Sequence, residues 1–176
     1  MCGIVGYLGL KDASPIILNG LKRLEYRGYD SAGISIYNGN KILTRKSKGK
    51  IDTLEKSITK VKSFKGNLGI GHTRWATHGE PNNKNAHPHV SNSNELHIVH
   101  NGIIENYSSL KEELITKGFH FNSDTDTEVL VNLIEYIQIK EKIKLGEAVQ
   151  LALNQVVGAY AIAVIDIKKP DEIVVA

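Results

Sequence analysis

The sequence predicts an α+β fold in which mostly antiparallel sheets carry helices on their faces. Short apolar runs typical of strands alternate with stretches in which apolar residues recur at helical spacing. Turn dipeptides join some of these strands directly, which favours antiparallel pairing. The chain has 176 residues, of which 41% are hydrophobic and 23% are charged. A chain of this length and composition is expected to form one domain with a substantial core.

The first expected elements are a glycine-rich strand at residues 3–9 and a helix that begins at Ser14-Pro15. Proline is favoured at the first helical position, because the N–H that it lacks would have no helical partner there. Apolar residues at helical spacing continue the helix, and Gly28 lies beyond its end. These apolar residues are Ile17, Leu18, Leu21 and Leu24.

A hairpin is expected next, around the turn sequence Asn38-Gly39-Asn40. Residues 34–37 and 41–45 flank this turn and are strand-like. The stretch 41–50 (KILTRKSKGK) is rich in lysine, which commonly protects the edge of a sheet from pairing with other chains. We therefore expect an edge strand there, with a phosphate-binding patch as the alternative. Residues 51–61 are expected to form a helix.

The middle of the chain combines two predicted strands with a long polar connection. A strand at 68–75 runs into residues 76–95, which are rich in Asn and His and show no period. A loop of this length in a compact domain is usually functional or disordered. The next strand, 96–100, is expected to end at Asn101-Gly102, a dipeptide that is common in turns.

The remainder of the chain is expected to add three helices and two strands. In order, these are helices at 107–117 (closed by Gly118), 124–139 and 145–156, then strands at 159–167 and 172–176 around a turn at Pro170-Asp171. The last strand looks cut short. We therefore expect the chain to be the N-terminal part of a longer one.

Composition argues against several classes of protein. The net charge of +3, from 22 basic and 19 acidic residues, is too small to indicate a nucleic-acid-binding protein. No apolar run approaches the roughly 18 residues of a membrane span, and the start lacks the features of a signal peptide. The single cysteine excludes an internal disulfide and fits a reducing compartment. A cytoplasmic protein is expected.

The sequence does not indicate a metal or cofactor site. Seven histidines are present, but there is no HExxH motif, and a thiolate zinc site would need more than one cysteine. The pair His87 and His89 lies in the polar loop and is expected to form hydrogen bonds there or to cap a substrate pocket. Glycines at 3, 6 and 9 do not make the GxGxxG pattern of a nucleotide site.

Cys2 is the residue with the most distinctive chemistry. Removal of Met1 would make it the first residue, so that one residue would carry a thiol nucleophile and a free α-amine. The reference pKa of such an amine is about 7.7–8.0, so it can act as the base and no separate histidine is needed. The alternative is a buried cysteine that acts as a small hydrophobic residue.

Four further segments concentrate residues that a core does not need. They are RLEYRGYDSAG at 23–33, GHTRWATHG at 71–79, HNGIIEN at 100–106 and, more weakly, SDTDTE at 123–128. Together with the Cys-Gly-Ile start they resemble the glutaminase domain of the glutamine–fructose-6-phosphate aminotransferase family, which belongs to the N-terminal-nucleophile glutamine amidotransferases. The resemblance covers the whole chain, residues 1–176, in order.

The resemblance implies a fold and a wider architecture. The fold is that of the N-terminal-nucleophile hydrolases, a four-layer αββα sandwich of two antiparallel sheets flanked by helices. The full-length protein would carry C-terminal sugar-isomerase domains that are missing here and would be a homo-oligomer, whereas the isolated domain could be a monomer. An active member of the family must have lost Met1.

The resemblance also implies roles for residues in this chain. Arg suits the planar α-carboxylate of glutamine, an acidic group must meet its α-ammonium, and an Asn amide beside a Gly N–H can hold an oxyanion. By themselves these residues also fit a surface salt bridge, a helix cap and a turn. The implied residues are Cys2, Asn101 and Gly102 for catalysis, Arg74, Trp75, Thr77, His78 and Asp126 for substrate binding, and Arg27 for support.

The expected activity is hydrolysis of L-glutamine to glutamate and ammonia. The ammonia would convert fructose 6-phosphate to glucosamine 6-phosphate, with the sugar bound only by the missing C-terminal domain. Two alternatives stay open. The same domain could serve an amidophosphoribosyltransferase or an asparagine synthetase, or the chain could bind glutamine without catalysis.

Overall fold

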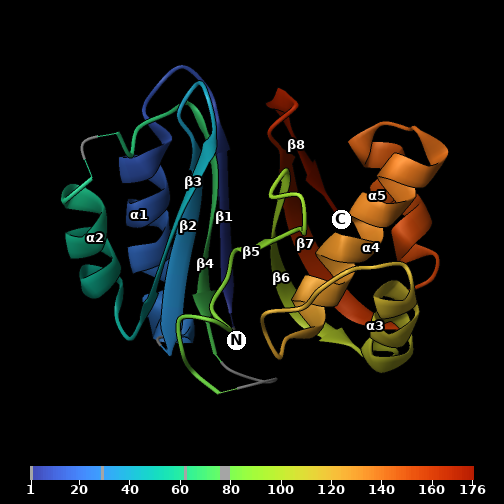
Figure 1. Cartoon of the computed structure of the whole chain (residues 1–176). Helices are drawn as coiled ribbons and strands as arrows, with labels where there is room; N and C mark the ends of the chain where they lie inside the picture. The colour runs from blue at the N-terminus through green and yellow to red at the C-terminus, as the bar shows by residue number, and fades with distance from the viewer. Residues whose placement is uncertain (1, 29, 62, 76–79) are drawn as a thin grey trace.

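Two four-stranded antiparallel sheets face each other, and helices cover the outer face of each (Figure 1). This is a computed structural model, and it describes residues 2–28, 30–61, 63–75 and 80–176. Helices α1 and α2 lie on one side and helices α3, α4 and α5 on the other. The four layers confirm the predicted αββα sandwich. No helix in these ranges is long and apolar enough to cross a membrane.

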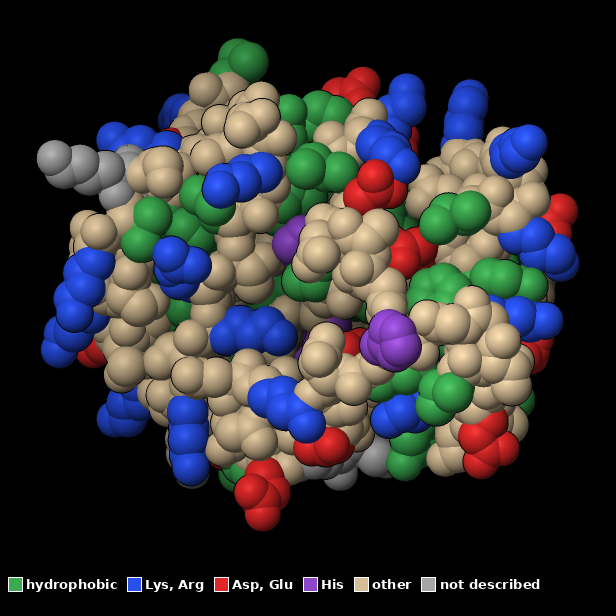
Figure 2. Space-filling model, viewed as in Figure 1, with side chains coloured by type: hydrophobic (Ala, Val, Ile, Leu, Met, Phe, Trp, Pro, Cys, Tyr) green, Lys and Arg blue, Asp and Glu red, His purple; other side chains and the backbone are tan. Residues whose placement is uncertain are grey.

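The first sheet has the strand order β1-β4-β2-β3. Its strands are β1 (Gly3–Leu8), β2 (Ser31–Tyr37), β3 (Ile42–Lys48) and β4 (Leu68–Arg74), and its helices are α1 (Ala13–Leu24), α2 (Ile51–Thr59) and the short 3₁₀ helix η1 (Glu25–Arg27). The predicted hairpin forms between β2 and β3, and Gly39 has a φ of +92° in its turn. Strand β3 lies at the edge, as its lysines predicted. Lys and Arg side chains are spread over both sides of the face that Figure 2 shows.

The second sheet has the strand order β5-β6-β7-β8. Its strands are β5 (His89–Val90), β6 (Leu96–Ile104), β7 (Gly158–Asp166) and β8 (Lys169–Val175), and its helices are α3 (Tyr107–Thr116), α4 (Asp126–Glu141) and α5 (Leu145–Leu153). Apolar residues of β6 and β7 pack against these helices, including Leu96, Ile98, Ile104, Ile162 and Val164. Each predicted helix of this half is present, within a few residues of its expected ends.

Two predicted turns are wrong. Asn101 and Gly102 do not end a strand, because both lie inside β6, where they pair with Ala161 and Tyr160 of β7. Pro170 lies in β8, and the turn before it is at residues 167–168. Strand β8 is an edge strand, where proline is tolerated because its missing N–H need not serve a neighbour.

Two smaller predictions need correction. Helix α1 starts at Ala13 with Asp12 as its cap, so Pro15 is the third helical residue rather than the first. The position is still in the first turn, where proline removes no helical hydrogen bond. The polar stretch 76–95 also contains a strand, the two-residue β5, which pairs with β6. Two residues are too few to show an alternating pattern.

Strands β4 and β6 carry the contact between the sheets, and their residues alternate between two faces. On β4, the side chains of Leu68 and Ile70 pack in the cluster between the sheets. Gly71 faces the helices instead, since a Cβ added to it would lie only 2.5 Å from Ile17 of α1. On β6, Val99 belongs to the same cluster. Since side chains alternate along a strand, His72 and Arg74 share the inner face of β4, and His97 and Asn101 share that of β6.

Candidate active site

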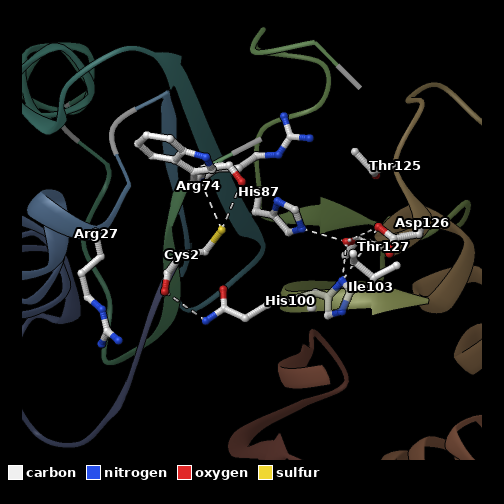
Figure 3. Close-up of a pocket in the computed structure, with 12 residues that line it drawn as sticks. Cys2, Arg27, Arg74, His87, His100, Ile103, Thr125, Asp126 and Thr127 are labelled. Carbon is white, nitrogen blue, oxygen red and sulfur yellow. Dashed lines mark hydrogen bonds and ion pairs between the residues drawn. The ribbon is translucent and has the colours of Figure 1, made fainter. Parts of the chain in front are cut away.

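A cavity of about 410 Å³ opens between the two sheets and the start of α4. Figure 3 shows Cys2 and Arg27 toward the first sheet, with Asp126 and Thr127 toward α4. The cavity thus draws its lining from six separate segments of the chain. Its lining residues are Cys2, Arg27, Arg74, Trp75, His87, His100, Asn101, Gly102, Ile103, Thr125, Asp126 and Thr127.

Cys2 lies immediately before β1 and beside the end of β4, because Gly3 pairs with Thr73. The side chain is half-buried, and Sγ accepts a hydrogen bond from the backbone N–H of Trp75 at 3.2 Å. A backbone donor aimed at sulfur stabilises negative charge there, as an attacking thiolate requires. The position therefore suits a nucleophile better than a packed hydrophobic residue.

Asn101 and Gly102 lie next to Cys2 across the gap between the sheets. The Asn101 amide donates from Nδ2 to the Cys2 carbonyl oxygen at 3.3 Å. Gly102 has a φ of +128°, and an added Cβ would lie 2.0 Å from the Ala159 carbonyl oxygen. Only glycine fits at this position. The strand pairing, rather than a turn, presents both residues to the cavity.

Arg74 ends β4 and is buried, with only 3% of its surface exposed. A surface salt bridge is therefore not its role. Burial lowers the pKa of its guanidinium, while the nearby Cys2, Asp30 and Asp126 act in the opposite direction. Since an arginine side chain stays protonated in proteins, Arg74 supplies a positive charge to the cavity.

Asp126 is the first residue of α4 and is also buried, with 4% exposed. Its Oδ2 accepts a hydrogen bond from the backbone N–H of Ile104 at 2.8 Å. The cap of the helix is Thr125, whose hydroxyl accepts from the Glu128 N–H. Asp126 therefore does not cap the helix, and its carboxylate gives the cavity a negative charge to match Arg74.

A group of buried histidines lies at the cavity, and two of them, His87 and His100, line it. The rings of His72 and His87 have centroids 4.3 Å apart. The Thr127 hydroxyl lies 2.8 Å from His87 Nε2 and 2.9 Å from His100 Nδ1. Burial lowers the pKa of His87, and the neighbouring His72 adds to this effect. At neutral pH the ring of His87 is thus uncharged and acts through hydrogen bonds.

The predicted site residues fall into three groups. Cys2, Arg74, Asn101, Gly102 and Asp126 come together as expected, and Trp75 and Arg27 also line the cavity. Thr77 and His78 lie outside the described residues. The third group was not among the predicted catalytic or binding residues and comprises His72, His87, His100 and Thr127, which contact these residues or line the cavity.

A signal for part of this third group exists in the sequence. His72 lies two residues before Arg74 on one strand, so the two share a face. His100 and Thr127 lie beside Asn101 and Asp126 in segments that the sequence singles out, and His87 lies in the polar loop, but no pattern sets these three apart from their neighbours. Across the ranges that the structure describes, no three residues of the types His, Cys, Asp and Glu are grouped to hold a metal ion.

Comparison with known sequences identifies the family. Residues 59–176 match the model described as a glutamine amidotransferase domain. The whole chain is 58% identical to glutamine–fructose-6-phosphate aminotransferase (isomerizing) from Bacteroides thetaiotaomicron, of which it covers 29%. It is 51% identical to the protein of the same name from Chlorobaculum tepidum, again covering 29%. The chain thus spans less than a third of the length of these relatives.

Comparison with solved structures gives the same result at the level of the fold. The structure of glutamine phosphoribosylpyrophosphate amidotransferase from B. subtilis superposes with a TM-score of 0.79, at 32% identity over 94% of this chain and 35% of that one. An allosteric regulatory enzyme of purine biosynthesis superposes with a TM-score of 0.82, at 31% identity over 95% of this chain and 36% of that one. The fold is that of the N-terminal-nucleophile amidotransferases, and the chain belongs to the family of glutamine amidotransferase domains.

Proposed function

We propose that this chain hydrolyses L-glutamine to L-glutamate and ammonia through a γ-glutamyl thioester on Cys2. One observation carries the proposal. Cys2, Asn101, Arg74 and Asp126 come from separate segments and line a single cavity of about 410 Å³. A nucleophile, an amide donor and two opposite buried charges are the groups that a zwitterionic amide substrate needs.

Substrate binding is assigned to the two buried charges. The guanidinium of Arg74 can donate two parallel hydrogen bonds to the α-carboxylate of glutamine. The carboxylate of Asp126 would face the α-ammonium, and the start of α4 favours its negative charge. The opposite charges fix the direction in which glutamine lies, and its side-chain amide then extends toward Cys2. Trp75, Thr77 and His78 are proposed to shape the same pocket.

The reaction begins with attack by the Cys2 sulfur on the side-chain amide carbon. The α-amine of Cys2, free once Met1 is removed, takes the thiol proton. Asn101 Nδ2 and the Gly102 N–H hold the resulting oxyanion. The amine then gives its proton to the leaving ammonia, and the C–N bond breaks to form the thioester. Water cleaves the thioester, releases glutamate and restores the thiol.

The use of the ammonia is proposed from the relatives. We propose that the chain works within a longer protein that passes ammonia to fructose 6-phosphate and forms glucosamine 6-phosphate. The identity of 58% to an aminotransferase of that name supports this acceptor over a phosphoribosyl acceptor, for which the identity is 32%.

A glutaminase assay combined with intact mass tests the proposal. Protein that has lost Met1 should release ammonia from glutamine, whereas protein that retains Met1 should be inactive, because an amide nitrogen cannot act as the base. Cys2→Ala should abolish turnover but keep glutamine affinity by calorimetry, because Arg74 and Asp126 bind the substrate. Glutamine binding without ammonia release in processed wild-type protein would instead identify a non-catalytic binding module.

A further inference from the structure

We propose that His72 is a positioning residue that orients the side-chain amide of Asn101 so that its NH₂ group faces Cys2. The inference rests on the proposed function, because an oriented NH₂ group matters only if an oxyanion forms there. His72 would act through Asn101 alone, without contacting the substrate. It would form the link between the first sheet, which carries the nucleophile, and the second sheet, which carries the oxyanion donor.

The geometry joins three residues across the gap between the sheets. His72 lies on β4, where it pairs with Ile4 of β1 and Gly33 of β2, and it is fully buried. Its Nε2 lies 2.8 Å from Oδ1 of Asn101 on β6. The other end of the same amide donates to the Cys2 carbonyl oxygen. Both ends of the Asn101 amide are therefore held by residues of the first sheet.

The hydrogen bonds allow only one orientation of this amide. The Cys2 carbonyl oxygen can only accept, so the Asn101 atom 3.3 Å from it must be Nδ2. If the amide were turned over, Oδ1 would face the Cys2 oxygen and two acceptors would repel each other. Oδ1 must then face His72, and it accepts from Nε2–H. The contact with Cys2 uses one hydrogen of Nδ2 and leaves the other for an oxyanion.

The His72 ring is suited to this task because it is uncharged. Burial lowers its pKa to about 4, while its hydrogen bond to Asn101 acts in the opposite direction. A neutral imidazole carries one N–H, and the Asn101 oxygen favours the form with that proton on Nε2. The donor is therefore present throughout the neutral pH range, without adding a positive charge beside Arg74.

Loss of this donor should affect the transition state more than substrate binding. Asn101 Oδ1 would be left without its imidazole donor, and the amide could turn its oxygen toward the reacting carbon. An oxyanion exists only near the transition state, so the loss should appear in kcat rather than in KM. The fall in kcat should not exceed the fall caused by removing the Asn101 side chain, which is about 10²–10³-fold.

A matched pair of variants tests the proposal. In His72→Gln the side-chain NH₂ group lies near the former position of Nε2, so kcat should stay within about threefold of wild type. In His72→Asn the same group is one methylene shorter and cannot reach Asn101 Oδ1, so kcat should fall by about tenfold or more with KM little changed. Both variants keep a buried amide, so their stabilities should be similar, as circular dichroism can verify.

His97→Asn is the control, because it makes the same change elsewhere between the sheets. His97 is buried, and its Nδ1 lies 3.1 Å from both the Ser35 and the Thr44 hydroxyls, away from the cavity. The kcat of His97→Asn should match wild type.

A double variant tests whether His72 acts through Asn101. His72→Asn should lower kcat no further when Asn101 is already alanine, because His72 acts through that side chain. Equal kcat in folded His72→Gln and His72→Asn would overturn the proposal.

A spectroscopic measurement separates this proposal from the proposed function. A long-range ¹H–¹⁵N imidazole spectrum, assigned with His72→Gln, should show a neutral His72 at pH 7 with its proton on Nε2. A proton on Nδ1, or a charged ring, would refute the positioning role whether or not the protein is active. Absence of glutaminase activity in processed wild-type protein would refute the proposed function and leave the spectroscopic prediction to be judged by itself.

Discussion

The contact between the two sheets has an apolar end and a polar end, and strands β4 and β6 contribute to both. On the inner face of β4, Leu68 and Ile70 are followed by His72 and Arg74. At the apolar end the sheets meet through an apolar cluster, beside which His97 lies within hydrogen-bond distance of Ser35 and Thr44. At the polar end they meet through hydrogen bonds and a cavity. The apolar cluster consists of Leu68, Ile70, Val99, Ala163 and Ile165.

The difference between the two ends separates stability from chemistry. The apolar end removes hydrocarbon surface from water and fixes how far apart the sheets lie. The polar end gains little stability, because burying Arg74, Asp126 and His72 costs free energy that their contacts only offset. Because the strands are rigid, the spacing set at the apolar end also sets the distance between Cys2 and Asn101.

Leu68→Ala tests the apolar end and should have the largest effect on the free energy of unfolding. Leu68 is fully buried and lies six residues before Arg74 on β4, or about 20 Å along an extended strand. The loss should be about 2–5 kcal/mol, measured by urea denaturation. The kcat of the fraction that remains folded should stay within about twofold of wild type. A large fall in kcat at full folding would show that the ends are not separable.

Asn101→Ala tests the polar end by removing the proposed oxyanion donor. We expect kcat to fall by about 10²–10³ with KM little changed, while the free energy of unfolding changes far less than in Leu68→Ala. Asn106→Ala is the matched control, because Asn106 bonds to the Val157 N–H and the Gln155 carbonyl outside the cavity. Wild-type kcat in folded Asn101→Ala would remove the oxyanion hole from the mechanism.

Arg74→Lys should have a smaller effect, on substrate affinity. Lysine keeps the charge but loses the paired donors that match a carboxylate. KM should rise by an amount equivalent to about 1–3 kcal/mol, with kcat less affected, as steady-state kinetics can measure. Arg45→Lys is the control, because Arg45 lies on edge strand β3 and donates to the Thr44 carbonyl. An unchanged KM in Arg74→Lys would assign the carboxylate to another residue.

The same comparison shows what the sequence could and could not predict. Helices and the hairpin around Gly39 were predictable, because their apolar spacing and turn residues act locally. Asn101-Gly102 was predicted as a turn, since the dipeptide favours one, but pairing with β7 overrides that local preference. In such a case the neighbouring strand decides the conformation, and the sequence alone does not show which strand will be the neighbour.

The candidate site divides in a similar way. Cys2, Arg74 and Asp126 were predictable because they lie in segments that carry a family resemblance. His72 was not predicted, although strand alternation places it on the face of Arg74. Its role depends on Asn101, which is 29 residues later and in the other sheet. Only the packing of the two sheets brings the pair together.

The smallest predicted effect concerns acid, to which both ends should be equally sensitive. Burial lowers the pKa of His97, at the apolar end, to about 3, and the nearby Lys46 adds to this effect. The pKa of His72, at the polar end, falls to about 4 for the same main reason. The unfolded chain, with histidine pKa values near 6.5, therefore binds protons first as the pH falls. Each ring contributes stability that is complete above about pH 6.5 and is lost as the pH falls toward its folded pKa.

Replacing either ring should make the protein less sensitive to acid by the same amount. Between pH 7 and 5.5, the free energy of unfolding of His97→Gln should fall by about 1 kcal/mol less than that of wild type, because one proton-binding group of the unfolded chain is gone. His72→Gln should show the same difference, and groups common to all three proteins cancel in the comparison. Urea denaturation at the two pH values measures it. An unchanged pH dependence in one variant would mean that its histidine is not held neutral in the folded protein, and the two ends would then differ in electrostatics as well as in chemistry.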